Sequence, residues 1–187
     1  FLVIAAAIKL TDPGPVFYLD ERLSRTGKKI KIYKFRSMKV EYCDGGKFGS
    51  KTREEVIASF GDPKLVEEFK KYQKLKKDPR ASSLGRFMRK TSIDELAQLF
   101  NVIKGDLSLV GPRPIVEAEL ERYGLLGGKF LAIKPGLTGL WQVSGRNDIG
   151  YDERVELDIY YVENWSLWMD LTILVRTLGV VVRGRGY

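Results

Sequence analysis

Residues 89–114 read RKTSIDELAQLFNVIKGDLSLVGPRP, and the expected fold depends on this stretch. It begins with basic residues and ends in a Gly-Pro-Arg-Pro connection. Between them, apolar residues recur at helical spacing up to Gly105, so the stretch predicts a helix over 93–104. The pattern favours burial of Ile93, Leu96, Phe100 and Ile103, with a polar stripe made of Asp94, Gln98 and Asn101.

Two adjacent acids, Asp94 and Glu95, lie at the start of this predicted helix, next to basic residues. The chain has no histidine, which excludes a Ser-His-Asp triad and a histidine-built zinc site. Acids beside guanidinium groups suit a phosphoryl substrate bound with magnesium. A structural alternative is a capping box, in which Ser92 caps the helix and Glu95 bonds back to it. The two interpretations are compatible, because a helix N-terminus also attracts phosphate.

The overall charge of the chain limits the classes of partner that it is expected to bind. The 187 residues include 32 Lys and Arg against 24 Asp and Glu, which gives a net charge of +8. Such an excess predicts anionic partners: nucleotides, nucleic acid or anionic lipid headgroups. The length and the 44% hydrophobic content suit one sizeable core and one domain. The single cysteine, Cys43, excludes an intrachain disulfide.

The remaining sequence predicts mainly helices with one N-terminal β-hairpin. Residues 16–18 and 29–35 predict strands joined by a turn at 24–28. Helices are expected over 63–77, 83–90, 115–123 and within the tail 152–182. No Gly-x-Gly-x-x-Gly or Walker lysine loop is present, and no parallel sheet is expected. The expected fold class is therefore α+β, mainly helical.

Both ends of the chain have features that suit a membrane. The first eight residues, FLVIAAAI, are apolar, but a helix needs about 20 residues to cross a bilayer. They are interpreted as the end of a longer apolar helix, and a short buried core helix is the alternative. The tail carries Trp165 and Trp168, which suit a membrane interface.

Five segments of the chain together resemble the bacterial sugar transferases, which are monotopic polyprenyl-phosphate phosphoglycosyl transferases. The matching segments are 12–17, 33–38, 91–96, 101–114 and 134–146, and they occur in the family's order. The resemblance implies one catalytic domain over 1–187, with residues 1–10 ending a truncated re-entrant membrane helix and 152–187 forming a helical tail. One departure is Ala97, where relatives usually carry proline.

The resemblance also implies a reaction. A sugar-1-phosphate would pass from a UDP-sugar to undecaprenyl phosphate with release of UMP, at the cytoplasmic face of the inner membrane. Such a step starts O-antigen, capsule or exopolysaccharide synthesis, with galactose or glucose as the favoured sugar. Asp94 would be the covalent nucleophile, and Glu95 would help to bind Mg²⁺ or to orient Asp94. Asp94 and Glu95 are thus the expected metal ligands.

Substrate contacts are expected from basic and polar residues of the matching segments. Arg89 precedes the acidic pair, and Arg113 lies between two prolines, where a guanidinium offers phosphate a bidentate contact. The full set of expected contacts is Lys34, Arg36, Arg89, Arg113, Gln142 and Arg146. A surface salt bridge or a structural turn is the alternative for each. Asp106 is either a third acid near the metal or a turn cap.

Two other classes compete with this interpretation. A basic nucleic-acid-binding module would explain the charge, but no RNA-binding signature, zinc spacing or helix-turn-helix pattern is present. A membrane-surface scaffold without catalysis would explain the basic helices and the tail. Neither of these two classes explains why a pair of acidic residues lies close to arginines. The expected partners are therefore a UDP-sugar, undecaprenyl phosphate and membrane lipids rather than nucleic acid, and a homodimer is left open.

Overall fold

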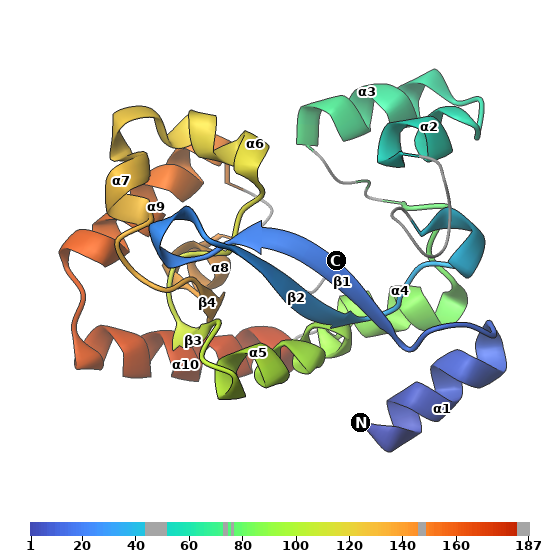
Figure 1. Ribbon diagram of the computed structural model, residues 1–187, viewed down its shortest axis with the longest axis horizontal. Helices are drawn as coiled ribbons and strands as arrows, with labels where there is room; N and C mark the ends of the chain where they lie inside the picture. Colours follow the sequence, from blue (N-terminus) through green and yellow to red (C-terminus); the bar gives the residue numbers. More distant parts are fainter. Residues whose placement is uncertain (44–51, 73–74, 76, 146–148, 183–187) are drawn as a thin grey trace. The chain divides into compact units, whose positions relative to one another are not determined.

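A computed structural model describes residues 1–43, 52–72, 75, 77–145 and 149–182. Contacts group the chain into two compact units, defined here as unit 1 (mainly 1–17 and 35–94) and unit 2 (18–34 and 95–186). The expected α+β class is confirmed, since helices dominate and the strands β1 (Phe17–Leu23) and β2 (Lys29–Phe35) pair in the predicted hairpin (Figure 1). The bounds of β2 are those expected from the sequence.

Unit 1 contains four α-helices within the described residues. They are α1 (Leu2–Thr11), α2 (Arg53–Ala58), α3 (Pro63–Tyr72) and α4 (Ser83–Lys90), with a short 3-10 turn, η2, at Val40–Tyr42. The prediction for 83–90 is confirmed, whereas the helix expected over 63–77 is described only to Tyr72. Ile57, Phe69 and Leu75 form the core between α2 and α3.

Helix α4 runs close to the chain that follows β2. Ser82 caps α4 by accepting a hydrogen bond from the Gly85 amide at 2.9 Å. A Cβ atom on Gly85 would lie 1.7 Å from the Ser37 carbonyl oxygen, so only glycine allows this approach. The Ser37 segment is therefore fixed against α4.

The two strands of the hairpin are joined by a tight turn in which two residues have positive φ. The 3-10 element η1 (Arg25–Gly27) joins the strands, with φ of 63° at Thr26 and 75° at Gly27. The predicted turn at 24–28 is thus confirmed. The hairpin is tied to the rest of unit 2 because the Leu23 amide donates to the Ile115 carbonyl at 2.8 Å.

The helix expected over 93–104 differs from the prediction in two ways. It is a 3-10 helix, η3 (Ile93–Gln98), followed by a short α-helix, α5 (Leu99–Ile103). Ser92 precedes it with φ of 57°, whereas a capping residue has extended backbone, so the predicted capping box is wrong.

The buried face of this helix is also the opposite of the one predicted. Leu96, Phe100 and Ile103 are exposed, Ile103 by 83%, while Gln98 and Asn101 are buried. Asn101 is fully buried because it completes the edge of β2: it accepts from the Tyr33 amide at 2.9 Å and donates to the Lys31 carbonyl at 2.8 Å. The strand's need for hydrogen-bond partners thus outweighs the apolar pattern of the helix.

Unit 2 also contains a parallel strand pair that the sequence did not predict. The strands β3 (Ser108–Val110) and β4 (Gly136–Thr138) pair in parallel, so the expectation of no parallel sheet is wrong. Glycines permit the close contact at the end of this pair: a Cβ on Gly136 would lie 2.2 Å from the Gly111 nitrogen. The backbone that leads into the Gly-Pro-Arg-Pro segment is therefore fixed by β4.

Helices make up most of the rest of unit 2 and form its cores. The segment expected as a helix over 115–123 is divided between α6 (Glu117–Leu120) and η4 (Glu121–Leu126), and α7 (Gly127–Phe130) follows. Helix α8 spans Leu140–Ser144, and the predicted helical tail is confirmed as α9 (Tyr151–Glu163) and α10 (Leu167–Val182). The cores of unit 2 consist of Ile115, Tyr123, Phe130, Val155 and Ile159, and of Val110, Tyr161 and Ile173.

Within the described residues, no helix has both the length and the apolar character needed to span a bilayer. Several helices nevertheless expose apolar side chains. In unit 2, α10 presents Trp168, Leu171, Val175 and Leu178 to the outside at helical spacing.

Candidate active site

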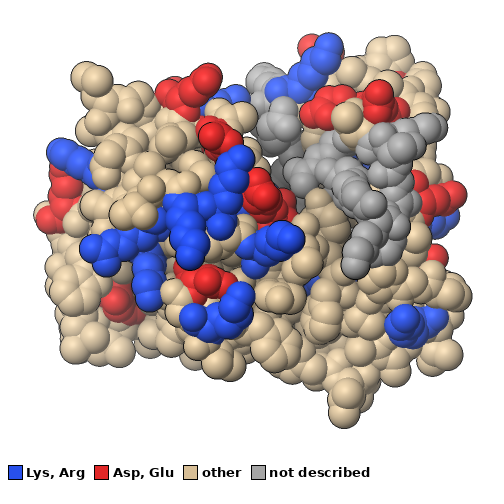
Figure 2. All heavy atoms as spheres, in the orientation of Figure 1, with Lys and Arg blue, Asp and Glu red and all other residues tan. Residues whose placement is uncertain are grey.

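A pocket in unit 2 brings together residues from five parts of the sequence. It is a small pocket, so it suits at most a phosphate group or part of a larger ligand. Three cations, Arg22, Lys34 and Arg113, face one acid, Glu95. The remaining lining residues are Ile32, Gln98, Pro114, Gly136, Leu137 and Gln142. Lys and Arg side chains also gather over the hairpin on the face shown in Figure 2.

The strands of the hairpin position two of these cations around a buried acid. Asp20 and Arg22 are two residues apart on β1 and share one face, so Arg22 pairs with Asp20 at 2.5 Å. Lys34 on β2 approaches the same carboxylate at 3.7 Å. Burial lowers the pKa of Lys34, whereas the charges of Asp20 and Glu95 raise it. Lys34 is thus a largely buried amine whose ion-pair partner is Asp20.

Arg113 differs from Arg22 and Lys34 because it forms no salt bridge with any described residue. Its backbone follows β3 and lies between two prolines, and Pro112 is fully buried. Its guanidinium carbon lies 5.8 Å from the ring centre of Trp141, a buried residue of α8. Arg113 is therefore a fixed cation at the pocket with donors available for an anionic ligand.

A buried acid, Asp158, lies on α9 in unit 2. This α9 residue is 1% exposed and accepts a hydrogen bond from the Tyr123 hydroxyl at 2.9 Å. Burial raises the pKa of Asp158 to about 7, while Tyr123 and the amide and charge of Arg113 lower it. Its Oδ1 atom has no hydrogen bond of good geometry within the described part of the chain.

The raised pKa of Asp158 predicts a dependence of stability on pH. The Asp158 carboxyl ionises near pH 4 in the unfolded chain but only near pH 7 in the folded protein, where its charge is buried. The contribution of Asp158 to the free energy of unfolding therefore falls as the pH rises from about 4 to 7. Asp158→Asn removes this ionisation. We expect the variant to gain stability relative to wild type, by on the order of 2–4 kcal/mol between pH 4 and 8. Urea unfolding of both proteins at the two pH values measures this, and an equal difference at both would contradict it.

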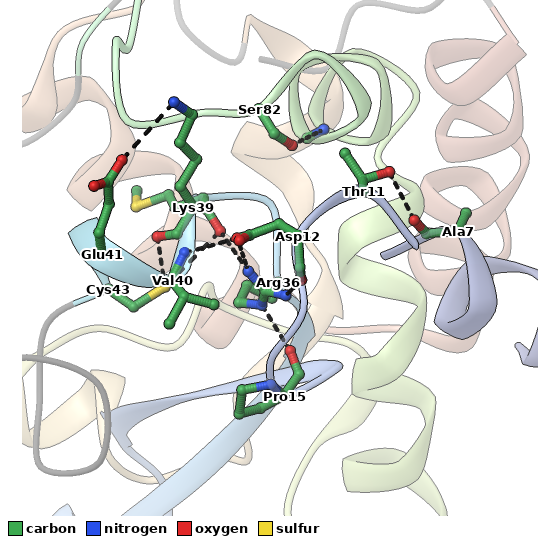
Figure 3. A network of polar contacts seen from close by, with 12 residues as sticks. Ala7, Thr11, Asp12, Pro15, Arg36, Lys39, Val40, Glu41, Cys43 and Ser82 are labelled. Carbon is green, nitrogen blue, oxygen red and sulfur yellow. Dashed lines mark hydrogen bonds and ion pairs between the residues drawn. The ribbon is translucent and has the colours of Figure 1, made fainter. Parts of the chain in front are cut away.

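Two other expected contacts lie in unit 1. Arg36 is 4% exposed and ion-paired with Asp12, and its Nε donates to the Pro15 carbonyl at 2.6 Å (Figure 3). The Val40 amide donates to the same Asp12 carboxylate at 2.8 Å. This network fixes the turn after α1, and we assign Arg36 a structural role within it.

Arg89, at the end of α4, is held by neighbours of unit 1. It donates to Asp78 Oδ2 and to the Ser37 hydroxyl, both at 2.9 Å. Asp78 also bonds Arg80, and these two arginines lower the pKa of Asp78 against the opposing effect of burial. A phosphate contact by Arg89 stays a prediction.

The other expected site residues have different positions. Asp94 directly precedes the pocket residue Glu95 in the chain, and both are partly buried. Arg146 lies outside the described residues. Asp106 accepts from Asn101 at 3.3 Å and pairs with Lys104 at 3.2 Å, contacts that suit the structural alternative. Cys43 is buried and donates to the Lys39 carbonyl.

The described residues can contribute to a magnesium site only if substrate or water supplies most of the ligands. No group of three acidic or thiol side chains converges among them. Mg²⁺ is often held by one or two carboxylates together with substrate phosphates and water. Glu95, beside the cations of the pocket, provides such a carboxylate. The residues therefore fit an ion whose coordination is completed by a bound phosphate.

The sequence interpretation missed two charged residues at the pocket and two buried polar residues of unit 2 outside it. The sequence analysis did not identify Arg22 and Asp20 because it expected the first strand only over 16–18. Their spacing places both side chains on one face of β1. The analysis did not identify Asp158 because a single acid in a helix is usually solvated. It therefore had no reason to select Tyr123, whose hydroxyl donates to Asp158. The available signal was the position of Asp158 next to Ile159 and three residues after Val155, both core residues.

The arginines and the lysine of this pocket are groups that can bind a phosphate. The chain belongs to the bacterial sugar transferase family, whose model matches residues 1–184.

Curated relatives agree with this family. The chain is 52% identical over 186 residues to the undecaprenyl-phosphate galactose phosphotransferase of Salmonella typhimurium, covering 99% of the chain but 37% of that protein. It is 45% identical to exopolysaccharide production protein ExoY of Rhizobium meliloti, covering 100% of the chain and 78% of that protein. It is 39% identical to the UDP-glucose:undecaprenyl-phosphate glucose-1-phosphate transferase of Klebsiella pneumoniae, covering 95% of the chain and 35% of that protein. The chain thus spans about a third of the first and third of these.

Proposed function

We propose that this chain transfers a hexose-1-phosphate from a UDP-sugar to undecaprenyl phosphate and releases UMP. The observation that carries the proposal is the pocket in which Arg113, Lys34 and Arg22 face Glu95, the residue after Asp94. Two relatives are named for transfer to undecaprenyl phosphate, one of galactose phosphate and one of glucose-1-phosphate. These names support the acceptor and the hexose class.

The proposed first step is nucleophilic. A carboxylate oxygen of Asp94 attacks the sugar-bearing phosphorus, and the bond from that phosphorus to the bridging oxygen breaks, so UMP leaves with the electron pair. In the second step a phosphate oxygen of undecaprenyl phosphate attacks the same phosphorus. The bond to Asp94 then breaks and the carboxylate is restored. No net proton transfer is needed.

The cations of the pocket have a defined task in both steps. Two anionic substrates and an anionic nucleophile repel one another, so fixed positive charge must stabilise the transferring phosphoryl group. Arg113 offers a planar pair of donors, and Lys34 offers a point charge in a desolvated position. Mg²⁺, held by Glu95 and Asp94, would supply charge neutralisation at the phosphates.

Release of UMP tests this function. The purified protein is incubated with UDP-galactose, UDP-glucose or UDP-N-acetylglucosamine, each with and without undecaprenyl phosphate. The proposal expects UMP and a lipid-linked hexose phosphate from at least one hexose donor. If none of the donors yields UMP, or if UDP is released instead, the proposed reaction is wrong.

We further propose that the chain works at the cytoplasmic face of the inner membrane. In unit 1, α1 exposes Leu2, Val3 and Leu10, and in unit 2, α10 exposes its apolar stripe. Apolar contact is not screened by salt, so we expect binding to anionic vesicles that high salt weakens but does not abolish. Val175→Ser with Leu178→Ser should weaken this binding by about tenfold in a flotation assay. Complete release by high salt would contradict the apolar contribution.

A further inference from the structure

Two residues other than glycine have a left-handed backbone within the described part of the chain. They are Thr26, with φ of 63°, and Ser92, with φ of 57°. In this conformation the Cβ atom of an L-residue crowds the following carbonyl oxygen, whereas glycine adopts it without that cost. Strained residues of this kind are concentrated at functional sites. A side chain at such a position is therefore expected to make a contact that glycine cannot make.

Thr26 makes such a contact, because its hydroxyl donates to the Arg25 carbonyl at 2.6 Å on the exposed hairpin turn. Ser92 differs. Its hydroxyl forms no hydrogen bond with any residue that the structure describes, although Ser92 is partly buried. The neighbouring hydroxyl, that of Thr91, donates to the Phe87 carbonyl of α4 at 2.9 Å. The described fold thus accounts for Thr26 and Thr91 but leaves the Ser92 hydroxyl without a structural role.

The turn around Ser92 is fixed within unit 1. The Ser92 amide donates to the Arg89 carbonyl at 3.1 Å. The Arg89 side chain is in turn bonded to Asp78 and to Ser37, both at 2.9 Å. Asp94, the proposed nucleophile, belongs to the same unit and follows Ser92 by two residues. Because two residues span at most about 7 Å of chain, the Cα atoms of Ser92 and Asp94 lie within about 7 Å of each other.

We propose that Ser92 is a catalytic residue whose hydroxyl donates a hydrogen bond to a non-bridging oxygen of the sugar phosphate that Asp94 attacks. The inference rests on the proposed function of Asp94. Negative charge is spread over the non-bridging oxygens in the transition state of phosphoryl transfer. A donor that the protein already holds in place stabilises this charge without reorganisation.

A serine in this conformation suits the task in two respects. Its hydroxyl adds no charge, whereas lysine or arginine would form an ion pair with the Asp94 carboxylate and weaken it as a nucleophile. Its left-handed backbone sets the direction in which the side chain leaves the turn, so the strain has a return in the reaction. Ser92 keeps its proton throughout, and the balance of the two proposed steps is unchanged.

Ser92→Gly and Ser92→Ala test this inference, because they remove the same hydroxyl but have opposite effects on the backbone. The rate of UMP release is measured in a single turnover with saturating UDP-galactose or UDP-glucose, without undecaprenyl phosphate. We expect both variants to release UMP about a hundredfold more slowly than wild type. Ser92→Gly should nevertheless unfold at the wild-type temperature or up to about 4 °C above it, because glycine relieves the strain.

The matched control is Thr26→Gly, which relieves the same backbone conformation at the exposed hairpin turn. It should release UMP at the wild-type rate. Glycine adds flexibility to a turn and alanine does not, so equal losses in the two Ser92 variants assign the effect to the hydroxyl. If Ser92→Ala does not fold, Ser92→Gly and its control decide the question alone.

The outcomes separate this inference from the proposed function. A loss of less than about tenfold in Ser92→Gly would overturn the inference, as would a wild-type rate in folded Ser92→Ala, since alanine also lacks the hydroxyl. If the wild-type protein itself releases no UMP, the proposed function fails, and the role of Ser92 fails with it.

Discussion

Asp94→Asn should abolish turnover while the protein keeps its fold. Asparagine has nearly the same shape as aspartate, so the start of η3 should be unchanged, but an amide cannot displace UMP from the donor. We expect UMP release with UDP-galactose or UDP-glucose and undecaprenyl phosphate to fall by more than about a thousandfold, as for other nucleophile replacements. Circular dichroism and the unfolding midpoint should match those of wild type.

The matched control is Asp62→Asn, which changes an exposed acid of unit 1 in the same way. It should retain full activity. Appreciable UMP release by Asp94→Asn protein that is free of wild-type enzyme would rule out Asp94 as the nucleophile. In that case Glu95, the acid that lines the pocket, would be the next candidate.

Arg113→Lys should lower kcat/KM by about tenfold or more, equal to about 1.4 kcal/mol of transition-state stabilisation. Lysine keeps the charge but loses the planar pair of donors. It also loses the flat contact with the Trp141 ring. The effect should include a higher KM for the UDP-sugar, because the lost contact is one with its phosphates.

Arg25→Lys makes the same exchange at an exposed position of the hairpin turn and should leave both constants unchanged. Arg89→Lys is the informative comparison, because Arg89 is bonded to Asp78 and Ser37. A defect in stability without a change in KM would assign Arg89 a structural role. Normal activity of Arg113→Lys would remove Arg113 from the phosphate site.

Regular patterns in the sequence predicted the regular parts of the fold. The alternation in β2 and the amphipathic stripe of α4 gave their observed bounds, because each element packs one face against its own unit. The parallel pair of β3 and β4 could not be predicted. Each strand has three residues, which is too few for an alternating pattern, and the pairing depends on contacts between glycine backbones.

The reversed face of η3 and α5 shows why periodicity alone misled. A pattern identifies an apolar face but not what covers it. Asn101 is buried because β2 needs partners for its backbone groups, and Ile103 is therefore turned outward.

The candidate site was predictable where a short motif carried it. The structure brings Lys34, Glu95, Arg113 and Gln142 into one pocket, although their roles stay predictions. It places Arg36 in a buried pair with Asp12, a contact across 24 positions that no local pattern could indicate. Asp20 and Asp158 were missed for a similar reason, since burial of an acid depends on tertiary partners.

The central claim is a covalent intermediate on Asp94, and intact-protein mass spectrometry tests it most directly. Purified protein is mixed with UDP-galactose or UDP-glucose in the absence of undecaprenyl phosphate. The account predicts a mass increase of one hexose phosphate group, release of an equal amount of UMP, and loss of the adduct when undecaprenyl phosphate is added. Peptide mapping should locate the group on Asp94. An unmodified protein that nevertheless forms lipid-linked hexose phosphate at full rate would contradict the account, as would an adduct that persists in Asp94→Asn.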